Sequence, residues 1–227
     1  MFISFEGIDG SGKSTQAQLL LDRLKAEGYD AVLYREPGGT ELSERVRELL
    51  LDPELHITSF AELLLFSAAR AQLVSERIRP ALENGQIILC DRFFDSTVAY
   101  QGGGRNLGEF DWLRDFNLKV TGGLVPGRTY LVEIDAATAA LRRARRAPAG
   151  MPATEDRMEA AGQAFYERVA AAYDRLARAE PDRIMRLDGS QPLEIIHEQI
   201  WNDVQALLVR VRGTPPPARC SCTREAR

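Results

Sequence analysis

Short apolar runs alternate along the chain with longer segments in which apolar residues recur at helical spacing. The helical segments cover residues 16–27, 41–51, 60–83 and 192–209, and an alanine- and arginine-rich stretch follows residue 134. Strands that alternate with long helices are typical of βαβ units, which form a parallel sheet covered on both faces. Ligands of such α/β folds bind at the carboxyl ends of the strands. The predicted strands are residues 2–6, 30–35, 86–91, 129–134 and 183–187.

Composition places the chain among ordinary globular proteins. Its 227 residues are 44% hydrophobic and 27% charged, which excludes collagens, coiled-coil arrays and wholly disordered chains. The net charge of −4 provides no global basic field, so we expect no nucleic-acid partner. The length favours one large domain followed by a tail. We predict a single domain over residues 1–210 and a disordered tail over 211–227, which contains three consecutive prolines.

Cysteine usage and hydropathy bear on the compartment. Cys90 lies in an apolar run, while Cys220 and Cys222 lie in the polar tail, so the cysteines form no disulfide framework. No apolar stretch reaches the roughly 18 residues that a membrane helix needs. We therefore expect a cytoplasmic protein without a membrane partner.

A phosphate-binding motif follows the first predicted strand. Residues 7–14 (GIDGSGKS) fit the pattern GxxxxGK[ST], between an apolar strand and an amphipathic helix. Backbone N–H groups of such a loop surround phosphate oxygens, and the helix adds the positive end of its dipole. Lys13 would contact the β- and γ-phosphates, and Ser14 would offer Mg²⁺ a hydroxyl ligand. The predicted nucleotide-binding residues are Gly7, Ile8, Asp9, Gly10, Ser11, Gly12, Lys13, Ser14 and Thr15.

The end of the third strand separates classes of nucleotide-binding protein. Asp91 could hold Mg²⁺ through water, or it could be a turn carboxylate at the strand end. Arg92 follows it where a typical ATPase places a carboxylate, and the chain has no NKxD guanine motif. Arg35 ends the second strand, so two guanidinium groups would converge on the crevice and bind a phosphate-bearing acceptor. Either arginine could instead pair with a nearby carboxylate.

Two further patterns point to a nucleotide kinase. Phe66 and Arg70 are four residues apart on one helix and share a face, which suits a planar heterocycle with carbonyl oxygens, although Phe66 could be a core residue. An arginine cluster, Arg142, Arg143, Arg145 and Arg146, precedes a Pro/Gly loop over residues 147–156. The cluster could be a solvated helix face. Next to a phosphate-binding loop it resembles a lid, at about residues 142–157, that closes over the triphosphate.

The motifs together resemble those of the thymidylate kinase family, P-loop enzymes that phosphorylate dTMP to dTDP with ATP. The resemblance runs from about Met1 to Leu208 and is most specific in FEGIDGSGKST, REPGGT, LLLFSAARAQ and DRFFDSTVAYQGGGR. It is closest to the bacterial form, whose P-loop lacks an arginine and whose lid supplies one. In this chain, Arg143 or Arg146 would be that arginine.

The resemblance implies a five-stranded parallel sheet, a homodimer in which helix 60–83 takes part, and a role for each matched residue. Asp9 would contact the sugar 3′-hydroxyl and place the acceptor arginines. Arg143 or Arg146 would join Lys13 and Arg92 in catalysis. The implied dTMP site consists of Arg35 and Arg92 for the phosphate, Phe66 stacked on thymine, Arg70 at O4, Thr97 and Gln101 at the N3 and O2 edge, and Tyr100 against the deoxyribose.

The mechanism expected from these residues is an in-line attack of the dTMP phosphate oxygen on the γ-phosphorus of ATP, within the pathway to dTTP. Two alternatives stay open on the residues alone. The chain could phosphorylate another monophosphate, such as UMP or dGMP. It could also be a regulatory module that senses ATP without transferring phosphate, although two convergent arginines and a lid fit such a sensor poorly.

Overall fold

The computed structural model describes residues 1–144, 157, 158 and 161–212. Its centre is a five-stranded sheet in the order β2-β3-β1-β4-β5, and every neighbouring pair of strands is parallel. The predicted α/β fold is therefore confirmed, and each strand lies within one residue of its predicted bounds at either end. The strands are β1 (Phe2–Glu6), β2 (Ala31–Arg35), β3 (Ile87–Asp91), β4 (Arg128–Glu133) and β5 (Ile184–Asp188).

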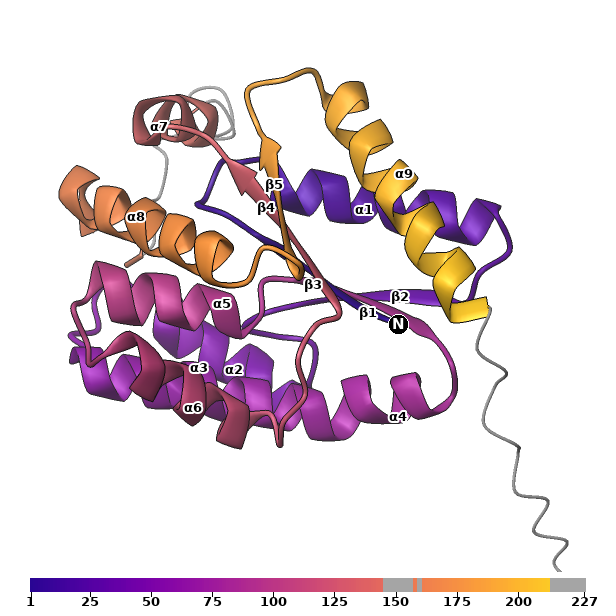
Figure 1. Cartoon of the computed structure of the whole chain (residues 1–227). Coiled ribbons are helices and arrows are strands. Elements are labelled where there is room, and N and C mark those ends of the chain that lie inside the picture. Colours follow the sequence, from indigo (N-terminus) through magenta and orange to yellow (C-terminus); the bar gives the residue numbers. More distant parts are fainter. Residues whose placement is uncertain (145–156, 159–160, 213–227) are drawn as a thin grey trace, which may run out of the picture.

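Side chains of β1 alternate between the two faces of the sheet, as the two-residue period of a strand requires. Ile3 and Phe5 belong to the core beneath α1 (Lys13–Ala26) and α9 (Leu193–Arg212), which cover one face (Figure 1). Phe2 belongs to the core on the opposite face. Strand β1 is therefore buried on both sides, and its carboxyl end delivers the glycine loop to a fixed place.

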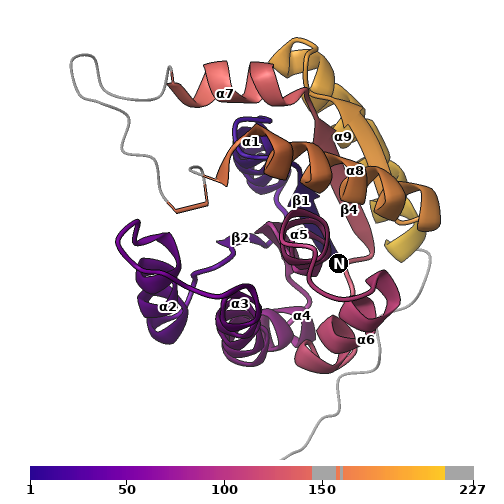
Figure 2. The same ribbon diagram turned by 90° about the vertical axis from the view of Figure 1, so that its left-hand side faces the viewer.

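The remaining helices cover the other face and surround the carboxyl ends of the strands (Figure 2). The long helix predicted over residues 60–83 is a continuous run of helical turns with a π-helical segment, η1, in the middle. The helices on this side are α2 (Glu41–Leu51), α3 (Ser59–Leu73), η1 (Val74–Ile78), α4 (Arg79–Glu83), α5 (Phe94–Thr97), the π-helical η2 (Val98–Gly104), α6 (Phe110–Val120), α7 (Ala136–Ala144) and α8 (Gln163–Ala179).

Helix α6 was absent from the sequence prediction. Its buried positions Leu113 and Asn117 are four residues apart, and Phe110 precedes Leu113 by three and packs at the edge of the same core. This spacing is a helical signal, but Asn117 is polar, so the apolar pattern alone is too short to be recognised. The buried Asn117 side chain is used for the site described below.

Several predicted features lie outside the described residues: Arg145, Arg146, the loop over 147–156 and the tail from residue 213. Helix α9 continues to Arg212, two residues beyond the predicted domain boundary. Within the described ranges, no helix is both long and apolar enough to span a membrane.

Candidate active site

The glycine loop after β1 and the turn after β3 lie side by side because the two strands are neighbours. The backbone N–H of Arg92 donates to Phe5 O at 2.9 Å, which joins the two strand ends directly. Gly7 has a φ of +135°, and a Cβ there would lie 2.3 Å from Val132 O. Only glycine fits such a position, so the loop can pass close to β4 before it enters α1 at Lys13.

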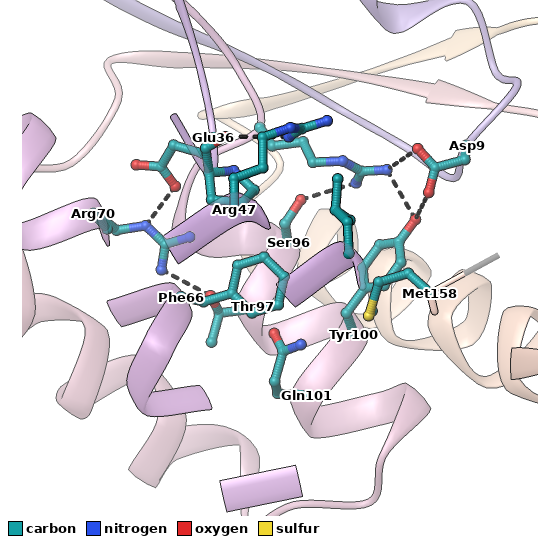
Figure 3. Close-up of a pocket in the computed structure, with 13 residues that line it drawn as sticks. Asp9, Glu36, Arg47, Phe66, Arg70, Ser96, Thr97, Tyr100, Gln101 and Met158 are labelled. Atoms are coloured by element: carbon teal, nitrogen blue, oxygen red, sulfur yellow. Dashed lines mark hydrogen bonds and ion pairs between the residues drawn. The ribbon is translucent and has the colours of Figure 1, made fainter. Parts of the chain in front are cut away.

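A cavity with about 570 Å³ of empty space, partly open to solvent, lies between the glycine loop and α3 (Figure 3). It combines an aromatic ring, guanidinium groups and neutral hydrogen-bonding side chains, which is the composition of a site for a polar heterocycle bearing an anion. Its lining residues are Asp9, Glu36, Pro37, Arg47, Leu51, Phe66, Arg70, Arg92, Ser96, Thr97, Tyr100, Gln101 and Met158.

Asp9 connects the glycine loop to this cavity. Its Oδ1 accepts hydrogen bonds from Arg92 Nη2 at 2.7 Å and from Lys13 Nζ at 3.3 Å. Its Oδ2 accepts one from the Tyr100 hydroxyl at 3.2 Å, and Arg92 Nη2 also donates to that hydroxyl at 2.9 Å. Burial alone would raise the pKa of Asp9, but the charges of Arg92 and Lys13 outweigh it and hold the pKa well below its usual range.

Glu6 holds the turn that presents Arg92. The backbone of Arg92 has a φ of +72°, in the left-handed region that non-glycine residues rarely adopt. Glu6 Oε1 accepts from the N–H of the next residue, Phe93, at 2.7 Å, and Oε2 accepts from the hydroxyls of Ser96 at 2.6 Å and Tyr173 at 2.8 Å. Burial, followed by the charge of Asp95, raises the pKa of Glu6 to about 7 even though Arg92 and these donors oppose the shift.

Arg70 is fixed before any ligand arrives. Its side chain is 2% exposed, and its Nε donates to Glu36 Oε2 at 2.7 Å. Its Nη1 donates to Thr97 Oγ1 at 2.7 Å and to Asn117 Oδ1 at 3.1 Å, and its Nη2 donates to Phe93 O at 3.2 Å. Burial raises the pKa of Glu36, and Arg70 opposes this shift. A guanidinium held on several sides presents its free edge in one direction only.

The prediction that Arg35 faces Arg92 is wrong for this structure. The Arg35 side chain is 51% exposed, pairs with Glu44 Oε2 at 2.7 Å and does not line the cavity. Successive side chains of extended backbone point to opposite sides, and Glu36 occupies the cavity side. Arg47 of α2, which was not among the predicted site residues, lines the cavity instead, and its Nη1 donates to Pro37 O at 3.1 Å.

A second hollow, with about 830 Å³ of space partly open to solvent, lies on the other side of the glycine loop. Arg142 lies across this hollow, because its side chain donates to Ser11 O at 3.3 Å and to Gly189 O at 2.9 Å. The sequence predicted it only as a member of the arginine cluster. Arg143 donates to Asp9 O at 2.8 Å and lies over the Tyr166 ring, so its guanidinium group contacts the glycine loop. The lining residues are Gly10, Ser11, Gly12, Thr15, Gln16, Val132, Arg142, Gly189, Gln191, Leu193 and Ile196.

The residues predicted to hold Mg²⁺ are compatible with that ion. Asp91 Oδ1 is buried and has no hydrogen-bond partner, so a metal-bound water would satisfy it. Ser14 is exposed in the first turn of α1. Among the described residues, no cluster of three or more acidic, histidine or cysteine side chains could hold a metal. Mg²⁺ takes most of its ligands from substrate phosphates and water, so one hydroxyl and one carboxylate are compatible with it.

Comparisons with known proteins agree with this geometry. The thymidylate kinase family model matches residues 5–200. The thymidylate kinase of Deinococcus radiodurans is 48% identical over 201 residues, covering 88% of this chain and 94% of that protein. That of Desulfovibrio desulfuricans is 49% identical over 213 residues, covering 92% and 97%. The crystal structure of thymidylate kinase from Ehrlichia chaffeensis has a TM-score of 0.72 at 34% identity, covering 90% and 98%.

Fold, site and sequence relationships therefore point to the same activity, the phosphorylation of dTMP in nucleotide biosynthesis with ATP as the phosphoryl donor. The alternatives of an ATP sensor and of a kinase for another monophosphate are set aside. The chain belongs to the thymidylate kinase family.

Proposed function

We propose that ATP and dTMP bind end to end, ATP in the hollow beside Arg142 and dTMP in the cavity beside Phe66, with their reacting phosphates meeting at Asp9. One observation carries this arrangement: a single carboxylate oxygen of Asp9 lies within 3.3 Å of Lys13, at the glycine loop, and of Arg92, in the cavity. Groups that serve the donor and the acceptor are thus held at a common point, as direct transfer between two bound nucleotides requires.

On the donor side, the backbone of residues 7–14 surrounds the β- and γ-phosphates and Lys13 adds a point charge. The hydroxyl of Ser14 and, through water, the carboxylate of Asp91 would hold Mg²⁺. When bound, the ion neutralises charge that develops on the phosphate oxygens. Arg143 contacts the transferring phosphoryl group, a role supported by its hydrogen bond to Asp9 O. Arg146 stays the second candidate for that role.

On the acceptor side, Arg92 and Arg47 bind the dTMP phosphate. Phe66 stacks on thymine, and Arg70 donates to O4 from the position that its four partners fix. Thr97 and Gln101 contact the N3 and O2 edge. Tyr100, held between Arg92 and Asp9, packs against the deoxyribose, where a 2′-hydroxyl would otherwise lie.

The chemistry needs positioning and charge stabilisation more than a strong base. The acceptor phosphate oxygen is already ionised at neutral pH, so no side chain has to remove a proton from the nucleophile. Lys13, Arg92 and a lid arginine stabilise the negative charge of the transition state.

The active unit is a homodimer built on α3. Phe60 is 51% exposed and Leu64 is 46% exposed, and the exposed Ala68 continues the same helical stripe at four-residue spacing. An apolar helix face on the surface is typical of a protein interface.

The cytoplasmic location expected from the sequence stays a prediction.

A matched pair of variants tests the acceptor site. We expect Arg47→Ala to raise the KM for dTMP by about tenfold or more, because a charge-assisted contact with phosphate is lost. Arg35→Ala removes an equally charged side chain that points away and should change KM less than threefold, while the KM for ATP stays near that of the parent in both. An Arg35→Ala defect as large as that of Arg47→Ala would contradict the proposed site.

A further inference from the structure

Glu62 is a completely buried carboxylate of α3 that lies behind the cavity, one helical turn before Phe66. Its Oε1 accepts hydrogen bonds from Gln101 Nε2 at 2.8 Å and from Arg105 Nε at 3.2 Å. Its Oε2 accepts from Arg105 Nη2 at 3.1 Å and from Arg157 Nη1. Glu62 does not line the cavity, but Gln101 does.

The contacts of Glu62 keep it ionised. Burial would raise its pKa, but the hydrogen bonds from Arg105, Gln101 and Arg157 prevail and lower the pKa below its usual value. An ionised carboxylate has no proton to donate and can only accept hydrogen bonds.

This fixes which way the Gln101 amide points. The amide has an NH₂ donor on one side and a carbonyl acceptor on the other, and only the NH₂ can bond to an ionised carboxylate. Because Nε2 is held by Glu62, Oε1 takes the other position. In Figure 3 the oxygen of Gln101 lies on the side of the Phe66 ring, where the base would stack.

We propose that Glu62 is a positioning residue that locks the Gln101 amide with its oxygen toward the bound base, so that the cavity accepts a pyrimidine carrying an N3–H donor and rejects cytosine. Thymine and uracil carry hydrogen on N3, whereas N3 of cytosine is an acceptor and would face the Gln101 oxygen without a proton between them. The inference rests on the proposed placement of the base beside Phe66.

The decisive variant is Glu62→Gln, measured by the ratio of kcat/KM for dTMP to kcat/KM for dCMP. The new amide keeps the shape of Glu62, and its oxygen takes the Oε2 position with Arg105 Nη2 and Arg157 Nη1, while the 3.2 Å hydrogen bond from Arg105 Nε is lost. Its NH₂ then faces Gln101, whose amide turns to accept from it and presents its own NH₂ to the base. We expect the ratio to fall by about tenfold or more, because a buried donor or acceptor facing the wrong partner costs about that much.

Two controls separate positioning from general damage to the buried cluster. Arg105→Lys weakens the same ion-pair cluster but leaves the hydrogen bond from Gln101 Nε2 to Glu62, so the ratio of kcat/KM values should stay within threefold of the parent. Gln101→Leu removes the acceptor, so the ratio should fall, and adding Glu62→Gln to that variant should change it no further. The ratio compares two substrates on the same folded molecules, so partial unfolding of a variant does not alter it.

The parent protein carries an independent test should Glu62→Gln not fold. The side-chain NH₂ resonance of Gln101, assigned by its loss in Gln101→Leu, should exchange slowly with solvent before any nucleotide is added. The inference is overturned by rapid exchange, by an unchanged ratio in Glu62→Gln, or by an equal fall in Arg105→Lys. A parent that phosphorylates dCMP as well as dTMP would overturn the proposed base site as well.

Discussion

Asp9 Oδ1 lies 2.7 Å from Nη2 of Arg92, a residue 83 positions later in the chain. The contact joins the ends of two neighbouring parallel strands, β1 and β3, and it places a carboxylate between the cation of the cavity and the cation of the glycine loop, Lys13. Asp9 therefore orients both cations and prevents two positive charges from repelling each other before phosphate arrives.

Asp9→Asn should impair both nucleotide sites. The amide cannot carry the charge that holds Arg92 and Lys13, so kcat/KM for dTMP should fall by about tenfold or more, since hydrogen bonds to charged groups contribute about 1.5–3 kcal/mol. Steady-state kinetics with each nucleotide varied measures this. Asp22→Asn, at an exposed position of α1, is the control. An Asp9→Asn enzyme with the parent's kinetics would contradict the proposal that Asp9 orients Arg92 and Lys13.

Two substitutions of Phe66 distinguish stacking on the base from simple filling of space in the cavity. Base–aromatic stacking contributes about 1–3 kcal/mol, so Phe66→Ala should raise the KM for dTMP by about tenfold or more. Phe66→Leu keeps an apolar side chain but no ring and should retain most of this defect. A leucine variant with parental KM, determined in the same titration of dTMP, would assign Phe66 to packing alone.

Glu6 makes stability depend on pH in a defined direction. Its folded pKa of about 7 lies above the ordinary 4.5, so the folded state binds this proton more tightly than the unfolded state does. The stabilisation is complete below pH 4.5 and is lost as pH rises through 7. Glu6→Gln has no such proton, so the parent's Tm should decline relative to that of Glu6→Gln between pH 5 and 8. Thermal melts that keep a constant difference over this range would contradict the assignment.

The α3 face can be tested in solution without substrate. Leu64→Lys places a charge in the middle of the apolar stripe, so sedimentation equilibrium should find a dimer for the parent and a monomer for the variant. Val125→Lys alters another exposed apolar residue, in the loop before β4, and should leave the dimer intact. A parent that sediments as a monomer at micromolar concentration would exclude the proposed dimer.

A site feature can be predicted from the sequence when neighbouring residues determine it, and less well when it depends on contacts between distant residues. The glycine loop is a contiguous motif between a strand and a helix, so its place could be read directly. That Arg92 faces the crevice of the glycine loop followed from parallel strand ends, whereas the role of Asp9 in placing the acceptor arginines followed from the family resemblance. Arg35 was misplaced because the sequence does not show whether this last residue of β2 or the following Glu36 faces the cavity.

Arg47 and Glu62 could not be assigned from sequence for a different reason. Both lie on amphipathic helices, where a charged residue is normally a solvated one. Their positions depend on how α2 and α3 pack over the carboxyl ends of the strands, and this packing is a property of the tertiary structure. No local pattern marks Arg47, because Ser43, four residues before it, is polar and its burial is visible only in the structure.

The stereochemical course at the transferred phosphorus tests the end-to-end arrangement most directly. With ATP made chiral at the γ-phosphorus by oxygen isotopes and sulfur, a single in-line displacement by the dTMP oxygen should invert the configuration in the dTDP product. Inversion is the predicted result, because the donor and acceptor sites meet at Asp9, whose carboxylate oxygens are engaged by Lys13, Arg92 and Tyr100 and serve to hold these groups in place. Retention of configuration would mean two displacements through a phosphorylated enzyme and would contradict direct transfer.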